Sequence, residues 1–467
     1  MAWLPTTRLQ ISGQRFMRRR LERALLGGDL RAVDESTRAP IRSMTAGLAL
    51  SIFLLAGCLA LALMRPQPGL GTAPILMEQQ TGALFVRIGD TLHPVLNLAS
   101  ARLIAKTGAD PQPMAATSLR QAKLGRLVGI PGAPQFVGAP LDSNESQWTV
   151  CDSRDGTTVI VGADQRSDPL RRDQTLLVTP TSGGSTYLLF DGRRSVVHPD
   201  DAATARALLL DGRSPRRVSP VLLNLIPESP SITAPRIPDA GRPGPGALAG
   251  FPVGSVLRVA LAGGDEHYVV LREGIQRVGQ VVADLIRFAD SQGTRTAVAV
   301  APDVIRAATA VTRLPVSDFP DHVGGPPTTD GPTFCTGWRH ATPDGAIVSF
   351  SVGGLPIPAG QAPVTLAQAD GAGPAVDAVY LPPGRAAFVR ATGLSGVNAR
   401  AGGRYLVSDT GVRFGVSDDD AAHDLGLADS LEASPWSLLT ALPAGPTLSR
   451  ASASVAQDVP PAGTRSP

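Results

Sequence analysis

The chain has 467 residues, with 43 Lys and Arg against 40 Asp and Glu, which gives a formal net charge of +3. Much of the positive charge lies near the N-terminus, so the remaining chain is close to neutral, and nothing in it indicates binding to nucleic acid. The region after Met64 is long enough for two or more domains of about 100–200 residues each.

Residues 1–44 are expected to form a basic N-terminal region. Within it, the stretch from Leu9 to Gly27 is predicted to form an amphipathic basic helix whose apolar members are Leu9, Phe16, Leu21, Leu25 and Leu26, and Gly27–Gly28 can end it. As membrane-proximal basic residues we single out Arg15, Arg18, Arg19, Arg20, Arg23, Arg38 and Arg42. Such a segment serves as a solvated tether, or docks to anionic lipid headgroups or to a partner's cytoplasmic domain.

Residues 45–64, TAGLALSIFLLAGCLALALM, contain no charged residue. About 20 apolar residues in a helix span the roughly 30 Å of a bilayer's hydrocarbon core, so we predict one transmembrane helix between Pro40 and Pro66. A buried core helix and a cleaved signal peptide are the alternatives, but a signal peptide has a shorter apolar core of about 7–15 residues. The arginines upstream place the N-terminus in the cytoplasm and the bulk of the chain outside.

Three cysteines are present. Cys58 lies in the predicted span, where it is an apolar filler. Cys151 and Cys335 lie in the outer region, where an oxidising compartment favours a disulfide between them over two separate buried thiols. Trp148 and Trp338 lie near the two cysteines, and we expect both in the core beside the bridge.

One local pattern recurs four times beyond the span: a strand, a turn with Gly, a second strand and a short helix. The copies begin at Phe85, Tyr187, Tyr268 and Tyr405. Two copies have acidic residues where the helix starts, at Asp200–Asp201 and at Asp418–Asp420. We interpret these as helix caps and not as calcium ligands, because the EF-hand spacing is absent.

The predicted fold class is α+β, with a single transmembrane helix and an elongated periplasmic region that has a β-rich central domain and four β-hairpin/helix repeat modules. The central domain is expected to consist of two separate segments of the chain. The expected divisions are 1–44, basic region; 45–64, transmembrane helix; 65–125, repeat module 1; 126–180, first segment of the central domain; 181–235, repeat module 2; 236–250, linker; 251–320, repeat module 3; 321–385, second segment of the central domain; 386–455, repeat module 4; and 456–467, disordered tail.

A search for catalytic motifs finds none. Neither Lys106 nor Lys123 follows a glycine, so the Gly-Lys-Ser/Thr of a P-loop is absent, as are the G-x-S-x-G and H-E-x-x-H motifs. The six histidines are scattered, and we interpret them as packing or turn residues. We therefore expect no catalytic residue, no metal site and no cofactor.

The N-terminal run PTTRLQISGQRFMRRRLERALLGGD, the following DESTRAPIRS, the single span and the two distant cysteines resemble EccB. That family is a core membrane component of the mycobacterial ESX, or type VII, secretion system. The resemblance implies assembly with EccC, the motor ATPase, and with EccD, EccE and further copies of the chain. It also implies an inner-membrane, single-pass protein with a cytoplasmic N-terminus and a large periplasmic region.

Three functional hypotheses follow. The first is a structural component of the secretion complex that belongs to its periplasmic assembly. The second is an ATP-hydrolysing subunit, as the family label ATPase implies, which would make ATP a cofactor. The third is a peptidoglycan-binding module, because the family's repeat domains are similar to a phage lysin's cell-wall-binding subunit.

Overall fold

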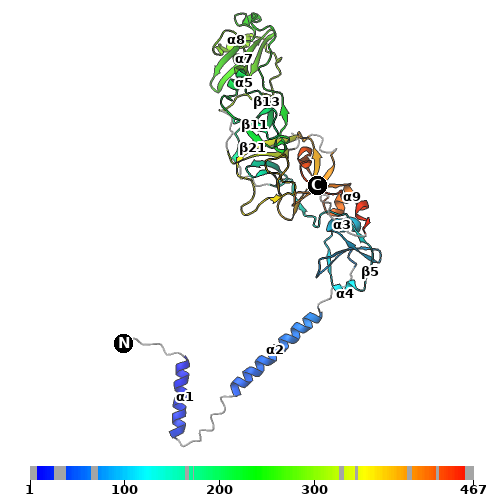
Figure 1. Cartoon of the computed structure of the whole chain (residues 1–467). Coiled ribbons are helices and arrows are strands. Elements are labelled where there is room, and N and C mark those ends of the chain that lie inside the picture. Colours follow the sequence, from blue (N-terminus) through cyan, green and yellow to red (C-terminus); the bar gives the residue numbers. More distant parts are fainter. Residues whose placement is uncertain are drawn as a thin grey trace. The chain divides into compact units, whose positions relative to one another are not determined.

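The computed structural model describes residues 8–25, 38–64, 72–162, 168–171, 173–325, 331–341, 345–396, 402–427 and 431–457. The chain divides into two compact units, residues 1–71 and residues 72–467. Figure 1 labels their helices and strands along the chain.

The first unit begins with helix α1 (Arg8–Leu25), which agrees with the basic helix predicted from Leu9 to Gly27. Gly27 and Gly28, expected to end it, lie outside the described residues. Arg18 and Glu22, one turn apart on α1, form an ion pair at 3.4 Å.

Helix α2 (Arg38–Met64) contains the predicted span, and its window Met44–Leu61 has a mean hydropathy of 2.2 with no residue buried in the protein. A long apolar helix with no covered face fits a membrane span and not the buried core helix that the sequence left open. The helix begins earlier than expected. We predicted that it would start after Pro40, whereas Pro40 lies in its first turn. Proline is tolerated there because the first-turn N–H groups have no partner within the helix.

The second unit contains four modules of one topology. In module 1, strands β1 (Ile75–Glu78), β2 (Leu84–Ile88) and β3 (Thr91–Val95) form an antiparallel meander, followed by helix α3 (Leu98–Ala105). The chain then returns as β4 (Gln112–Met114), which pairs in parallel with β1. The sheet order is thus β4-β1-β2-β3, with the fourth strand beside the first.

The other three modules repeat this order. Module 2 consists of β11 (Leu176–Pro180), β12 (Thr186–Phe190), β13 (Arg193–Val197), α5 (Ala202–Ala207) and β14 (Arg216–Val218). Module 3 consists of β16 (Val256–Leu261), β17 (Gly264–Leu271), β18 (Gly274–Val278), α7 (Gln280–Ala289) and β19 (Val298–Ala299). Module 4 consists of β24 (Arg385–Thr392), β25 (Arg404–Ser408), β26 (Arg413–Val416), α9 (Asp419–Leu425) and β27 (Glu432–Pro435).

A short second helix follows the fourth strand of each module: α4 (Ala116–Leu119), α6 (Pro220–Leu223), α8 (Pro302–Ala307) and α10 (Trp436–Leu439). The smaller elements are β5 (Lys123–Leu124), β6 (Leu127–Val128), β7 (Ala139–Pro140), β15 (Glu228–Ser229), η2 (Gly246–Leu248), α11 (Arg450–Ala453) and β28 (Ala456–Gln457).

The predicted hairpin and helix are confirmed in all four modules, but several strands pair outside the divisions expected from the sequence. Strand β11 belongs to the sheet of module 2 and not to the central domain, and β6 and β28 pair with each other in the sheet of module 1. The expected tail therefore starts two residues too early. Strands β6 and β28 were missed because their partners are distant in sequence, and two-residue strands have no periodicity of their own.

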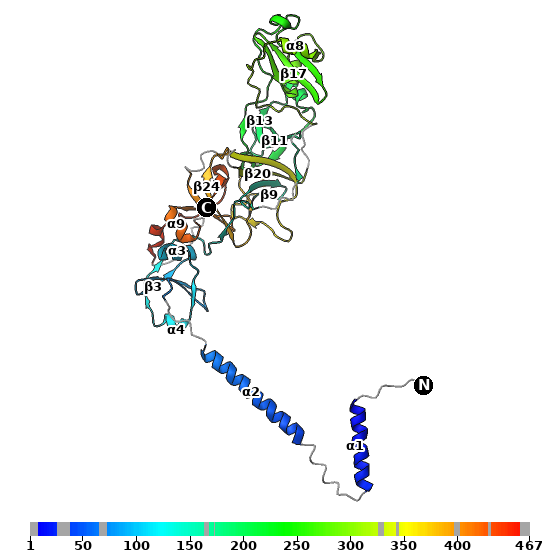
Figure 2. The same cartoon turned by 180° about the vertical axis from the view of Figure 1, so that it is seen from behind.

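The central sheet has the order β10-β21-β20-β8-β9-β23-β22. Its two long hairpins are β8 (Trp148–Ser153) with β9 (Gly156–Val161), and β20 (Thr333–Ala341) with β21 (Gly345–Gly353). Its shorter strands are β10 (Asp168–Pro169), β22 (Val364–Thr365) and β23 (Ala378–Tyr380). Figure 2 labels β9 and β20 beside β24 of module 4.

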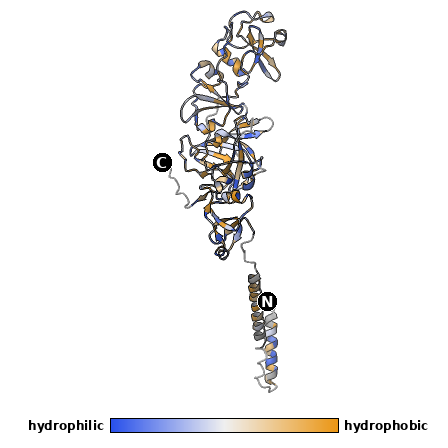
Figure 3. Ribbon diagram, turned by 90° about the vertical axis from the view of Figure 1, so that its right-hand side faces the viewer, coloured by the Kyte–Doolittle hydropathy of each residue, from blue (hydrophilic) through white to orange (hydrophobic). Residues whose placement is uncertain are grey.

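The modules pack on the centre and on one another. One hydrophobic core joins the central sheet to the sheets of modules 2 and 4, through residues such as Trp148, Leu176 and Val389. Helix α5 packs against α7, and α3 packs against α9 and α11. Modules 2 and 3 thus pair through their helices, as do modules 1 and 4. Figure 3 shows hydrophobic residues, in orange, on strands and helices throughout the second unit.

Candidate functional site

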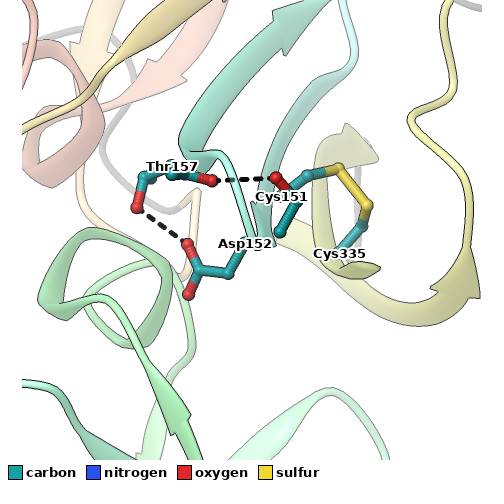
Figure 4. Close-up of a disulfide and its surroundings, with 6 residues drawn as sticks. Cys151, Asp152, Thr157 and Cys335 are labelled. Atoms are coloured by element: carbon teal, nitrogen blue, oxygen red, sulfur yellow. Dashed lines mark hydrogen bonds between the residues drawn. A yellow bond between two sulfur atoms is a disulfide. The ribbon is translucent and has the colours of Figure 1, made fainter. Parts of the chain in front are cut away.

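A disulfide joins the two central hairpins. Cys151 on β8 lies directly opposite Cys335 on β20 in the antiparallel ladder, with an S–S distance of 2.02 Å and a Cα–Cα distance of 4.0 Å. Figure 4 shows the bridge across the strands. The predicted disulfide is confirmed, and both cysteines are buried. It closes a loop with a sequence separation of 184, which contains modules 2 and 3.

Trp148 and Trp338 form a second cross-strand pair three residues from the bridge. Both side chains are fully buried in the core that joins the centre to modules 2 and 4. The Trp338 Nε1–H donates a hydrogen bond of 2.9 Å to the Leu394 carbonyl oxygen, which ties β20 to the loop after β24. The expectation that both tryptophans lie in the core is therefore confirmed.

The residue after Cys151 is a buried acid, Asp152. Its carboxylate accepts hydrogen bonds from the Ser219 backbone N–H at 2.6 Å and the Thr157 hydroxyl at 2.9 Å; Figure 4 shows the latter. Ser219 is the N-cap of α6, so this carboxylate joins the central sheet to module 2. Burial raises the pKa of Asp152, against the opposing effect of these hydrogen bonds.

A second buried acid, Asp377, lies on the other side of Thr157. Its carboxylate accepts hydrogen bonds from the backbone N–H groups of Thr157 at 2.7 Å, Asp370 at 2.8 Å and Gly371 at 2.5 Å. Thr157 therefore bridges two buried carboxylates, one through its hydroxyl and one through its backbone. The arrangement fixes the β8–β9 hairpin to module 2 on one side and to the segment before β23 on the other.

The contact between modules 1 and 4 includes buried polar groups. Asp424 on α9 is 1% exposed and receives hydrogen bonds from the Arg450 guanidinium at 2.5 and 3.0 Å. Arg102 on α3 donates to the Leu425 carbonyl oxygen at 3.1 Å and pairs with Asp110 at 3.0 Å. These bonds orient the helices of the two modules where their hydrophobic faces meet.

The acidic helix starts are caps, as predicted. The Asp201 carboxylate accepts the Thr204 backbone N–H at 2.9 Å, and the Asp418 carboxylate accepts the Ala421 backbone N–H at 2.7 Å. Hydrogen bonds, first from the Thr204 hydroxyl to Asp201 and from the Ser417 hydroxyl to Asp418, lower the pKa of both acids. Among the described residues, no three His, Cys, Asp or Glu side chains are grouped to hold a metal ion.

The predicted basic residues divide between the first two helices. On α1, the structure describes the side chains of four of these basic residues, and all four are exposed: Arg15, Arg18, Arg19 and Arg20. Arg23 lies in α1, and Arg38 and Arg42 lie near the beginning of α2, but their side chains are outside the described region.

Neither lysine of the chain has the position of a P-loop lysine. Lys106 follows α3 as its C-cap in the left-handed conformation, and Lys123 lies on β5, where its Nζ is 3.5 Å from Asp90. Phosphates bind at the opposite, N-terminal, end of a helix. The features found at the centre are therefore those of a scaffold: a covalent bridge, paired tryptophans and satisfied buried carboxylates.

The sequence analysis missed Asp152 and Asp377. Asp152 could have been noticed as an acid inside a strand that is otherwise largely apolar. Its partner Ser219 is 67 residues away, and no local pattern connects the two. Asp377 gave no signal, because it lies in a Gly- and Asp-containing segment typical of an exposed loop.

Residues 4–462 match the family described as "Type VII secretion system ESX-1, transport TM domain B". The chain belongs to the EccB family. It is similar to the ESX-3 secretion system ATPase EccB3 of Mycolicibacterium smegmatis, with 37% identity over 97% of this chain and 91% of that protein. It is also similar to the ESX-5 secretion system ATPase EccB5 of Mycobacterium tuberculosis, with 33% identity over 98% of this chain and 94% of that protein.

Two solved structures contain a chain of the same fold. A chain of an intact ESX-5 inner membrane complex matches with a TM-score of 0.72 and 31% identity, over 100% of this chain and 98% of that chain. A chain of an EccB3 dimer from the ESX-3 core complex matches with a TM-score of 0.70 and 34% identity, over 82% of this chain and 100% of that chain. The predicted fold class and EccB membership are thus confirmed.

Proposed function

We propose that this EccB-family chain is a structural component of a type VII (ESX) secretion complex in the inner membrane. Helix α2 anchors it as a single-pass protein, and the region from Thr72 onward contributes to the periplasmic assembly of the complex. The observation that carries the proposal is the match to a chain of an intact ESX-5 inner membrane complex over the whole length of this chain.

The centre of the second unit supports a structural role. The disulfide joins β8 to β20, Asp152 joins the central sheet to module 2, and the bond from Arg102 to the Leu425 carbonyl oxygen joins modules 1 and 4. Each bond lies between segments that are far apart in the sequence, so together they hold the modules in one body. A body with fixed geometry can present several surfaces to partner subunits at once.

The partners are proposed to be EccC, EccD and EccE of the same secretion complex, together with further copies of this chain. Self-association is supported by a solved EccB3 dimer, to which this chain is similar over 100% of the dimer chain's length. The exposed arginines of α1 provide a basic surface for the cytoplasmic side of such an assembly.

The assembly is tested by co-purification. A tagged full-length chain, purified in mild detergent from the membranes of its own host, should bring EccC, EccD and EccE with it, as identified by mass spectrometry. A variant with Arg15, Arg18, Arg19 and Arg20 changed to Gln should recover less of them, because these arginines provide the cytoplasmic contact. Cys58→Ala is the matched control and should recover the normal amount. Recovery of the wild-type chain alone would refute the proposal.

The orientation is proposed to be N-terminus in the cytoplasm, because nine arginines precede residue 45 whereas Arg65 is followed by none until Arg87. In a Cys58→Ala background, a membrane-impermeant maleimide should label Leu261→Cys on intact cells but not Gln14→Cys. Labelling of Gln14→Cys alone would reverse the assignment. Both positions should be labelled after the cells are opened.

The relatives are named ATPases, so hydrolysis needs its own test. Because Lys106 and Lys123 are the only lysines and neither follows a glycine, we expect the purified full-length chain to release no phosphate from ATP above background. Turnover that a single substitution in this chain abolishes would establish the hydrolase instead.

A further inference from the structure

One end of module 1 combines exposed apolar and basic side chains. We define this basic–apolar end by Ile88, Arg120, Lys123, Leu124 and Arg126, of which the two apolar residues are clearly exposed. Ile88 is 46% and Leu124 is 55% exposed. Arg120, Lys123 and Arg126 are exposed, and Lys123 pairs with one acid, Asp90, at 3.5 Å. The end is therefore both hydrophobic and net positive.

The segment that carries most of these residues is not held in place by a core. Both residues of β5 are exposed, whereas a strand over a core normally has one buried face. Helix α4, just before it, has no buried residue either. Leu124 is thus an exposed large apolar residue on a segment that packs on no core, and with Ile88 of β2 it leaves apolar surface at this end open to a partner.

The strand register places this surface at the end of module 1 where the module's first residues lie. Lys123 and Leu124 pair in parallel with Thr91 and Leu92, next to the β2–β3 turn. The same end of β2 pairs with the first residues of the module, because the Arg87 backbone N–H donates to the Pro74 carbonyl oxygen at 2.9 Å. The opposite end of the module, the β1–β2 turn, instead has Gln79, Gln80 and Thr81.

The covalent tether limits what this end can reach. Eight residues separate Met64, the last residue of α2, from Ala73. A fully extended chain covers at most about 3.6 Å per residue, so the start of module 1 stays within about 30 Å of the end of the membrane helix. This limit holds whichever side of the membrane the module occupies.

We propose that the basic–apolar end of module 1 docks on the surface of the bilayer that holds its own anchor, with anionic phospholipid headgroups as the ligand. Leu124 and Ile88 enter the interface between headgroups and acyl chains. Lys123 and the two arginines contact lipid phosphates, as basic residues beside apolar ones do at membrane surfaces. Docking fixes module 1, and through its helix contacts module 4, relative to the membrane.

The test uses the full-length chain with Cys58→Ala in lipid nanodiscs whose headgroups carry a nitroxide quencher. An environment-sensitive fluorophore is attached at Gln121→Cys, in the basic–apolar end, or at the matched Gln80→Cys, at the opposite end of the same module. In discs containing phosphatidylglycerol, the label at 121 should be quenched and the label at 80 should not. Replacing the lipid by neutral phosphatidylcholine should weaken quenching at 121.

The charge contribution is tested with Arg120→Gln and Lys123→Gln, singly and together. Each substitution should lower the ratio of docked to free module 1 about fivefold in anionic discs, because one basic residue at an anionic surface contributes about 1 kcal/mol. An unchanged melting temperature shows that the variants remain folded. Equal quenching at positions 80 and 121, or quenching at 121 that is the same with and without the two basic residues, would overturn the proposal. Neither result bears on membership of the secretion complex.

Discussion

Removal of the Cys151–Cys335 disulfide tests how much this bridge stabilises the central sheet against unfolding. In the chain-entropy description, the stabilisation grows with the logarithm of the loop length. For the separation of 184, the entropy is about 18 cal/mol/K, or about 5 kcal/mol at 25 °C. If modules 2 and 3 stay folded when the centre opens, the flexible loop is shorter and the contribution falls. We therefore expect the change Cys151→Ala with Cys335→Ala to cost about 2–5 kcal/mol.

The assay is urea unfolding of the full-length chain in detergent, followed by tryptophan fluorescence. Trp148 and Trp338 lie opposite each other three residues from the bridge, so they report opening of the central sheet. Reduction of the wild-type chain should reproduce the loss, and Cys58→Ala should not change the midpoint. A double variant that loses less than about 1 kcal/mol would refute the idea that the bridge locks the centre, since that is below the usual range for a natural disulfide.

The remaining predictions concern buried and capping acids. Because the pKa of Asp152 is raised in the folded state, its contribution to stability falls as the pH rises through that pKa, and Asp152→Asn should remove this slope from a plot of unfolding midpoint against pH. Asp201→Ala and Asp418→Ala should each cost about 1 kcal/mol at neutral pH. Because the folded-state pKa of both caps is lowered, this cost should vanish as the pH falls through that lowered pKa, and a constant cost in acid would contradict the capping role. Arg450→Ala should lower the midpoint of thermal or urea unfolding, because it leaves the buried Asp424 carboxylate without its cation, whereas an unchanged midpoint would show that Asp424 finds another partner.

The sequence predicted the elements that have strong local signals. The span was visible as an uncharged run. The hairpin and helix of each module were visible because a Gly turn separates two strands, and in modules 2 and 4 acidic residues precede the helix. The disulfide followed from two cysteines in the outer region of the chain. These inferences use neighbouring residues or residue counts alone.

The elements that were missed depend on long-range pairing. Strands β4 and β19 have two or three residues each, and they are strands only because they pair in parallel with β1 and β16. The bond from Ser219 to Asp152 crosses from module 2 to the centre. Modules 2 and 3 pair through α5 and α7, and this pairing depends on which apolar helix faces the sheets leave uncovered. The sequence alone does not show which faces those are.

The most direct test of the central claim is an image of the intact secretion complex, purified from host membranes, with this chain carrying a C-terminal label of visible size. The proposed function predicts that the complex contains one membrane helix per copy of this chain and that the label lies outside the membrane, on the periplasmic side. A complex without the label, or a label on the cytoplasmic side beside the motor ATPase, would contradict the assignment of this chain to the periplasmic assembly.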